Sequence, residues 1–94
     1  MIAKIKFEGD FEYDYIYYSN DLNLDIQKFS KWLYENKSHP FWIYDDTGEL
    51  EGVDYRGNAL VYWINKYFDT SSDKAYIIKE CTSEELNHDL IISL

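Results

Sequence analysis

The chain has 94 residues, of which 46% are hydrophobic and 19% are aromatic. It carries 18 acidic residues against 9 Lys and Arg residues, which gives a formal net charge of −9. We expect one folded domain spanning residues 1–94, because this length and apolar content suffice for a single core and argue against disorder. The negative charge disfavours direct binding to nucleic acids and to anionic membranes.

The N-terminal segment alternates polar and apolar residues and lacks the apolar core of a signal peptide. No run of apolar residues approaches the length that spans a membrane. Cys81 is the single cysteine, so no disulfide is expected within the chain. These features together predict a cytoplasmic protein.

Residues 2–7 and 11–17 both alternate with a period of two, which predicts two strands joined by a turn at residues 8–10. The alternation predicts that three tyrosines line the core side of the second strand: Tyr13, Tyr15 and Tyr17. The neighbouring Tyr18 is left to face a partner protein, because an aromatic ring with a polar end suits an interface.

The register of this hairpin is predicted by matching apolar side chains across the two strands. Placing Phe7 opposite Phe11 aligns the apolar residues of both strands on one face. The same register sets Lys4 opposite Asp14, so that part of the acidic charge is expected to be neutralised by the first strand.

Apolar residues at helical spacing predict helices over residues 24–36 and 59–68. Asn23 or Asp25 is expected to cap the first helix, and Asn58 the second. Strands are predicted at four further segments: 41–44, 50–53, 74–80 and 90–94. A capping-box pattern at residues 82–85 predicts a short helical turn. The core is expected to include Ile26, Phe29, Leu33, Leu60, Ile64 and Phe68.

The predicted order is strand, strand, helix, strand, strand, helix, strand, strand. Layer packing then favours an α+β fold with a mainly antiparallel sheet and two helices packed on one face. No linker or low-complexity segment interrupts the chain.

Two stretches, residues 7–27 and 38–55, contain many carboxylates and no Lys or Arg. Acidic side chains mixed with aromatics suit the capture of a basic protein surface, because charge steers the encounter and tyrosines supply contact area. The candidate partner-binding residues are Glu8, Asp10, Tyr18, Asp21, Asp45, Asp46, Glu49, Glu51 and Asp54.

The triplet Asp46-Thr47-Gly48 matches the one around the catalytic aspartate of aspartic proteases. A hairpin turn is favoured instead, because Asp45 places a charge where that family needs an apolar strand. A calcium loop starting at Asp45 fails, because Leu50 and Arg56 stand where Gly and Glu are needed. We expect no catalytic residues, no metal site and no cofactor, since no acid–base or nucleophile pattern is present.

The sequence therefore favours a small acidic inhibitor that occupies a basic surface of a partner protein. One example is a phage anti-defence protein that mimics nucleic acid. A bacterial toxin-immunity protein and a housekeeping interaction module remain as alternatives. A carboxylate-based hydrolase is disfavoured because no histidine or lysine lies near the carboxylates of residues 45–54. The oligomeric state is left open.

Overall fold

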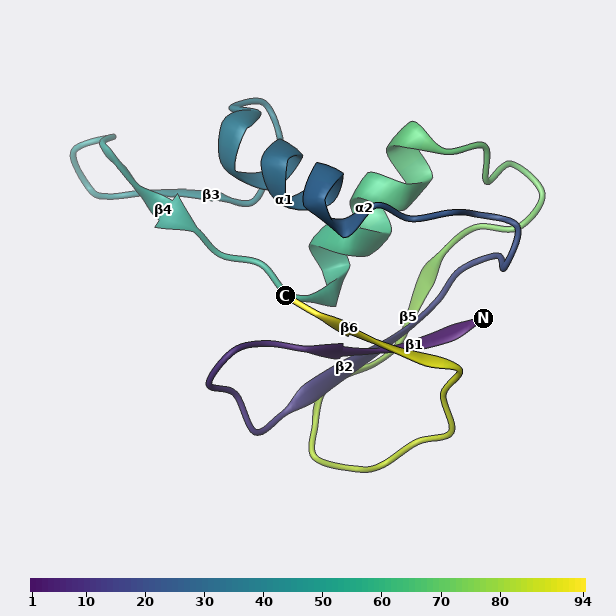
Figure 1. Cartoon of the computed structure of the whole chain (residues 1–94). Helices are drawn as coiled ribbons and strands as arrows, with labels where there is room; N and C mark the ends of the chain where they lie inside the picture. Colours follow the sequence, from purple (N-terminus) through teal and green to yellow (C-terminus); the bar gives the residue numbers. More distant parts are fainter. The chain divides into compact units, whose positions relative to one another are not determined.

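The computed structural model describes all residues 1–94 and shows an α+β fold (Figure 1). Its elements, in chain order, are β1 (Ile2–Lys6), β2 (Tyr13–Tyr17), α1 (Ile26–Glu35), β3 (Trp42–Tyr44), β4 (Leu50–Val53), α2 (Gly57–Tyr67), β5 (Tyr76–Thr82) and β6 (Leu90–Ser93). Neither helix is long and apolar enough to cross a membrane. The predicted elements are confirmed except for the helical turn at residues 82–85, where β5 ends and an irregular segment begins.

The strands form two sheets rather than one. The larger sheet has four strands in the order β5-β2-β1-β6, and the smaller is the ribbon of β3 and β4. The pairs β1–β2, β2–β5 and β3–β4 are antiparallel, as expected, whereas β6 runs parallel to β1. The larger sheet is therefore mixed.

The chain divides into two compact units. Unit 1 comprises residues 1–23 and 56–94, with the four-stranded sheet and α2, and unit 2 comprises residues 24–55, with α1 and the ribbon. The placement of both helices on one sheet face remains a prediction.

The predicted register of the first hairpin is wrong by one residue. Ile5 lies opposite Asp14 and Lys4 lies opposite Tyr15, so Lys4 does not face Asp14. The predicted register assumed one buried face, but both faces of this sheet are covered. Ala3, Lys4, Ile5, Tyr15 and Ile16 are all buried.

On one face of the unit 1 sheet, α2 packs against β2 and β5. Its buried residues include Leu60, Trp63 and Ile64, which confirms the predicted apolar face of this helix. Gly57 begins the helix, and a Cβ at this position would lie 3.1 Å from the Cβ of Asp14 and 3.2 Å from Ile16. The absence of a side chain at residue 57 therefore lets the helix approach the sheet closely.

On the other face, the irregular segment of residues 83–89 covers Lys4 and Tyr15. The Tyr15 hydroxyl donates to the carbonyl of Glu84 at 2.9 Å and accepts from the amide of Leu86 at 3.1 Å. Lys4 pairs with Glu85, and this hydrogen bond raises the pKa of the lysine. Tyr15 is thus a core residue, as predicted, although it lies on the face opposite α2.

In unit 2, the Asp25 side chain caps α1 by accepting from the amides of Gln27 and Lys28, as predicted. His39, whose ring is buried, caps the C-terminal end of α1. Its Nδ1 accepts from the amide of Phe41 at 3.1 Å, so Nε2 carries the proton and donates to the carbonyl of Leu33 at 2.6 Å. His39 thereby satisfies a carbonyl that the end of a helix leaves unpaired.

Candidate protein-binding site

In unit 1, the acidic residue with the most contacts is Asp14, which is fully buried on β2. Its carboxylate accepts hydrogen bonds from the amides of Gly57 (2.7 Å) and Cys81 (2.9 Å) and from the guanidinium of Arg56 (3.1 Å). It therefore serves as a remote N-terminal cap of α2, a position where the helix dipole also favours a negative charge. The predicted local cap, Asn58, instead lies inside the first helical turn.

Arg56 connects this buried carboxylate to the loop between β1 and β2. Its guanidinium bonds Asp10 at 2.8 Å and lies 4.3 Å from the ring centroid of Phe7. Burial lowers the pKa of Arg56, but its contacts with Asp14 and then Asp10 raise that pKa by more than burial lowers it. The net shift of the pKa is therefore upward. Asp10 is consequently ion-paired, which weakens its candidacy as a free partner-binding residue.

The other unit 1 candidates divide into exposed acids and one buried aromatic. Glu8 and Asp21 are exposed, as a binding role requires. Tyr18 is only 4% exposed, because its amide and carbonyl pair with residue 1 and hold it against the sheet. This burial argues against the prediction that Tyr18 is an aromatic anchor. The most exposed aromatic side chain of unit 1 is Phe11, at 89%, which the predicted register had placed in a strand pair.

In unit 2, Asp45 organises the turn of the β3–β4 ribbon. Its Oδ1 accepts from the amide and hydroxyl of Thr47 and from the amide of Glu49, at 2.7–2.9 Å. The Thr47 hydroxyl, followed by the backbone amides, lowers the pKa of the Asp45 carboxyl. Gly48 completes the turn with a φ of 84°, a conformation that favours glycine. The Asp-Thr-Gly triplet thus forms a hairpin turn in this chain.

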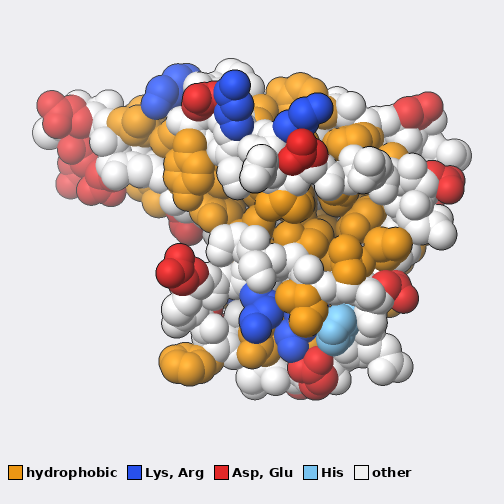
Figure 2. Space-filling model, viewed as in Figure 1, with side chains coloured by type: hydrophobic (Ala, Val, Ile, Leu, Met, Phe, Trp, Pro, Cys, Tyr) orange, Lys and Arg blue, Asp and Glu red, His pale blue; other side chains and the backbone are white.

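The remaining carboxylates of the ribbon are exposed: Asp46, Glu49, Glu51 and Asp54. None of them takes part in an ion pair. Figure 2 shows acidic side chains gathered over the end of the ribbon.

Three large apolar side chains of the same ribbon are also exposed, and sequence patterning did not indicate them. Ile43 is 39% exposed, Tyr44 54% and Leu50 43%. Two-stranded ribbons have unpaired backbone groups on both edges, and they are marginally stable when isolated. A surface that combines apolar side chains with surrounding carboxylates has the composition of a protein-binding patch.

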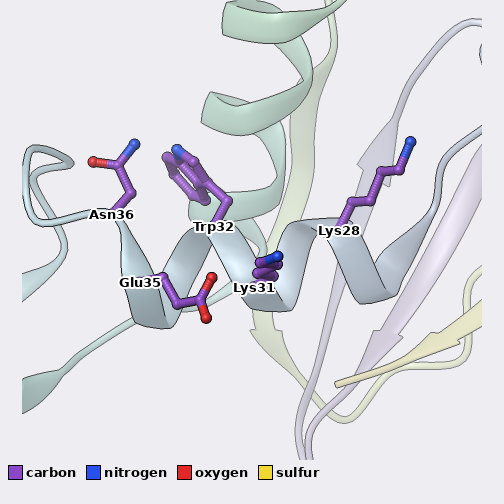
Figure 3. A pocket seen from close by; sticks show the side chains of 5 residues that line it. All are labelled: Lys28, Lys31, Trp32, Glu35 and Asn36. Atoms are coloured by element: carbon purple, nitrogen blue, oxygen red, sulfur yellow. The ribbon is translucent and has the colours of Figure 1, made fainter.

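The exposed side of α1 differs in charge from the ribbon. A shallow pocket of about 390 Å³ lies here, lined by Lys28, Lys31, Trp32, Glu35 and Asn36 (Figure 3). The indole of Trp32 also contacts the ring of His39, with the centroids 4.7 Å apart. Next to α1, the ammonium of Lys37 lies over the ring of Trp42, at 4.3 Å from its centroid. The helical spacing of Lys28, Trp32 and Asn36 could have indicated this pocket from sequence.

No group of three or more His, Cys, Asp or Glu side chains is arranged to hold a metal ion. Cys81 is exposed, with a φ of 49°, in the part of β5 where its pairing with β2 is irregular. His88 is half-buried in the segment that covers Tyr15, with its ring centroid 6.1 Å from that of the tyrosine.

Comparisons of the chain with known protein families, with curated proteins and with solved structures give no match.

Proposed function

We propose that the chain is a binding protein, not an enzyme, and that it inhibits or regulates a partner by occupying a basic surface of that partner. The single observation that carries this proposal is the β3–β4 ribbon. Four exposed carboxylates without a basic partner and three exposed apolar side chains occur together on this short element.

The two kinds of side chain have different effects on binding. Carboxylates accelerate the encounter with a basic surface and set its orientation, mainly through the association rate. Apolar side chains such as Tyr44 and Leu50 lose water in the complex and slow dissociation. A basic groove that binds nucleic acid offers both features, because it combines Lys and Arg with aromatic or apolar side chains. An anti-defence or immunity-type inhibitor of such a groove is the form of the proposal that we favour.

The hydrogen bonds of the ribbon determine which of its carboxylates can be reversed without damage to the turn. Asp45 holds the turn together, so its reversal would damage the ribbon as well as remove charge. Asp46→Lys combined with Glu49→Lys reverses two exposed charges and leaves the Asp45 carboxylate in place. The matched control is Glu12→Lys with Glu80→Lys, which changes the net charge equally at two exposed sites of unit 1.

The experiment measures association and dissociation rates of a partner captured from a host lysate and then purified. The ribbon reversal is expected to lower the association rate by about tenfold or more. The control pair is expected to have a much smaller effect. Raising ionic strength from about 0.01 M to 0.15 M shortens the screening length from about 30 Å to 8 Å and should slow association to the wild-type ribbon. Equal sensitivity of both pairs, or none in either, would refute the ribbon as the binding site.

A further inference from the structure

The charge of unit 2 is strongly separated along its chain. All of its Lys residues, Lys28, Lys31 and Lys37, lie on α1 or in the turn that follows it. Five of its carboxylates lie within residues 45–54, where no Lys or Arg occurs. Residues 28–37 carry these three lysines and one carboxylate, Glu35, so the net charges of this basic surface and of the acidic ribbon are opposite in sign.

The basic surface is also concave and aromatic. In Figure 3 the side chains of Lys28 and Lys31 lie along one side of α1 with the indole of Trp32. The pocket volume of about 390 Å³ falls within the usual range of binding pockets, about 300–1,000 Å³. Two ammonium groups and the single carboxylate of Glu35 line the pocket beside the indole. The net positive charge favours an occupant that brings carboxylates together with apolar or aromatic side chains.

The ribbon of the same chain has this composition. Tyr44 and Leu50 are exposed, and Asp46 and Glu49 lie beside them in sequence, at the end of the ribbon. Within unit 2 the turn of the ribbon points away from α1 (Figure 1). No ion pair joins the ribbon carboxylates to the lysines of α1. The ribbon carboxylates and the lysines of α1 therefore do not neutralise one another within one copy.

We propose that the pocket on α1 binds the acidic ribbon of a second copy of this chain. The contact joins two different surfaces, so it is head-to-tail, and it forms either closed rings or short linear assemblies. The net charge of −9 on each copy opposes association, so the complex is weak and forms only at high protein concentration. Formation of the complex covers the ribbon and makes the second copy a competitor of any other ribbon partner. This inference does not depend on the proposed function.

The experiment is a charge exchange followed by sedimentation velocity, over protein concentrations that reach the millimolar range. The pocket variant is Lys28→Glu with Lys31→Glu, and the ribbon variant is Asp46→Lys with Glu49→Lys. Each variant alone places like charges in contact, and its dissociation constant for self-association is expected to rise at least about tenfold. An equimolar mixture restores opposite charges at both contacts, and its association is expected to return to within about threefold of wild type.

Isotope labelling then locates the contact. A ¹⁵N-labelled ribbon variant keeps an intact pocket, so adding the unlabelled pocket variant should shift the amide signals of residues 28–36. Native-like spectra of both variants are required first. If either pair unfolds the chain, the milder replacements by Gln at the same positions take its place.

Three outcomes would overturn the proposal. The first is wild-type protein that stays monomeric throughout the concentration range. The second is a mixture that associates no better than its components. The third is a set of shifted amides that lies outside both the pocket and the ribbon. None of these outcomes bears on the rates measured with a basic partner, so the failure of this inference and that of the proposed function can be told apart.

Discussion

The two units use similar acidic sequences for opposite purposes. In unit 1, Asp14 is fully buried and receives three hydrogen bonds, and Asp10 is held by Arg56. In unit 2, the carboxylates of the ribbon point into solvent, and only Asp45 is fixed, by its own turn. Asp14 and Asp10 of unit 1 therefore contribute to the fold, whereas the exposed carboxylates of the ribbon in unit 2 make no ion pair.

This difference shows what a stretch without basic residues does and does not imply. Residues 7–27 lack Lys and Arg, yet Arg56, which lies 42 residues after Asp14 in the sequence, forms an ion pair with it. Residues 38–55 receive no such partner. Charge separation along the sequence becomes charge separation on the surface only where the tertiary fold brings no counter-charge.

The largest expected effect comes from Asp14→Ala. The substitution leaves a largely buried guanidinium and the amides of Gly57 and Cys81 without their carboxylate. Loss of one member of a buried pair costs about 3 to 5 kcal/mol, so unit 1 should be severely destabilised. Chemical denaturation combined with amide hydrogen exchange of unit 1 measures the change.

The control for that substitution is Asp10→Ala. The Asp10 side chain is 46% exposed, although it bonds the same arginine. Exposed ion pairs contribute about 0 to 1 kcal/mol, so this loss should be small. Equal losses at residues 10 and 14 would show that the buried position of Asp14 has no special role, and would remove the contrast between the two units.

Sequence patterning predicted most of the elements but not the roles of the residues in them. The ribbon strand at 50–53 and the cap at Asp25 were found because both depend on local signals. The register predicted for the first hairpin was wrong because matching apolar side chains across the strands assumed that only one face of the sheet is buried. Lys4 sits on the second face, beneath Glu85, which is 81 residues away in sequence.

Other errors have local as well as distant causes. Thr82 ends β5, and its hydroxyl accepts from the amide of Glu84, so the residues of the expected capping box lie in an irregular segment instead of a helix. The parallel pairing of β6 with β1 has no local signal in either strand. Of the candidate binding residues, Tyr18 was lost to burial and Asp10 to an ion pair. The ribbon acids stay available because their turn is local.

A smaller effect is expected for the buried polar residue of unit 2, by His39→Phe. The new ring keeps aromatic contacts with Trp32 and Trp42 but cannot donate to Leu33 or accept from Phe41. Two buried backbone groups lose their partners, at a cost of about 1 to 3 kcal/mol. Thermal unfolding with hydrogen exchange of residues 24–55 measures it, and Ser38→Ala, at an exposed neighbour, should change stability by less than about 0.5 kcal/mol. A loss no larger than that of the control would contradict the capping role of His39.

Gly57→Ala tests how closely α2 approaches the sheet. Alanine favours helix by about 0.5 to 1 kcal/mol over glycine, but its Cβ would meet Asp14 at 3.1 Å and Ile16 at 3.2 Å. Overpacking costs about 1 to 3 kcal/mol, so the net expectation is a loss of about 1 to 2 kcal/mol in denaturant unfolding. Gly52→Ala on the ribbon is the comparison, because no atom lies within 4 Å of its added Cβ. A stabilised Gly57→Ala protein would mean that the helix shifts freely.

The finest test concerns the pH dependence of the ribbon, through Asp45. Its pKa is lowered in the folded state, first by the Thr47 hydroxyl, so ionisation of this carboxyl stabilises the turn. That stabilisation is fully present above the usual aspartate pKa of about 3.9 and is lost as pH falls through the lower, folded-state pKa. Thr47→Val removes the principal donor, so the carboxyl should titrate at a higher pH, closer to its usual value. The carboxyl ¹³C shift of residue 45 against pH measures both curves. Coincident curves would show that the Thr47 hydroxyl does not hold Asp45, and the turn would then depend on backbone amides alone.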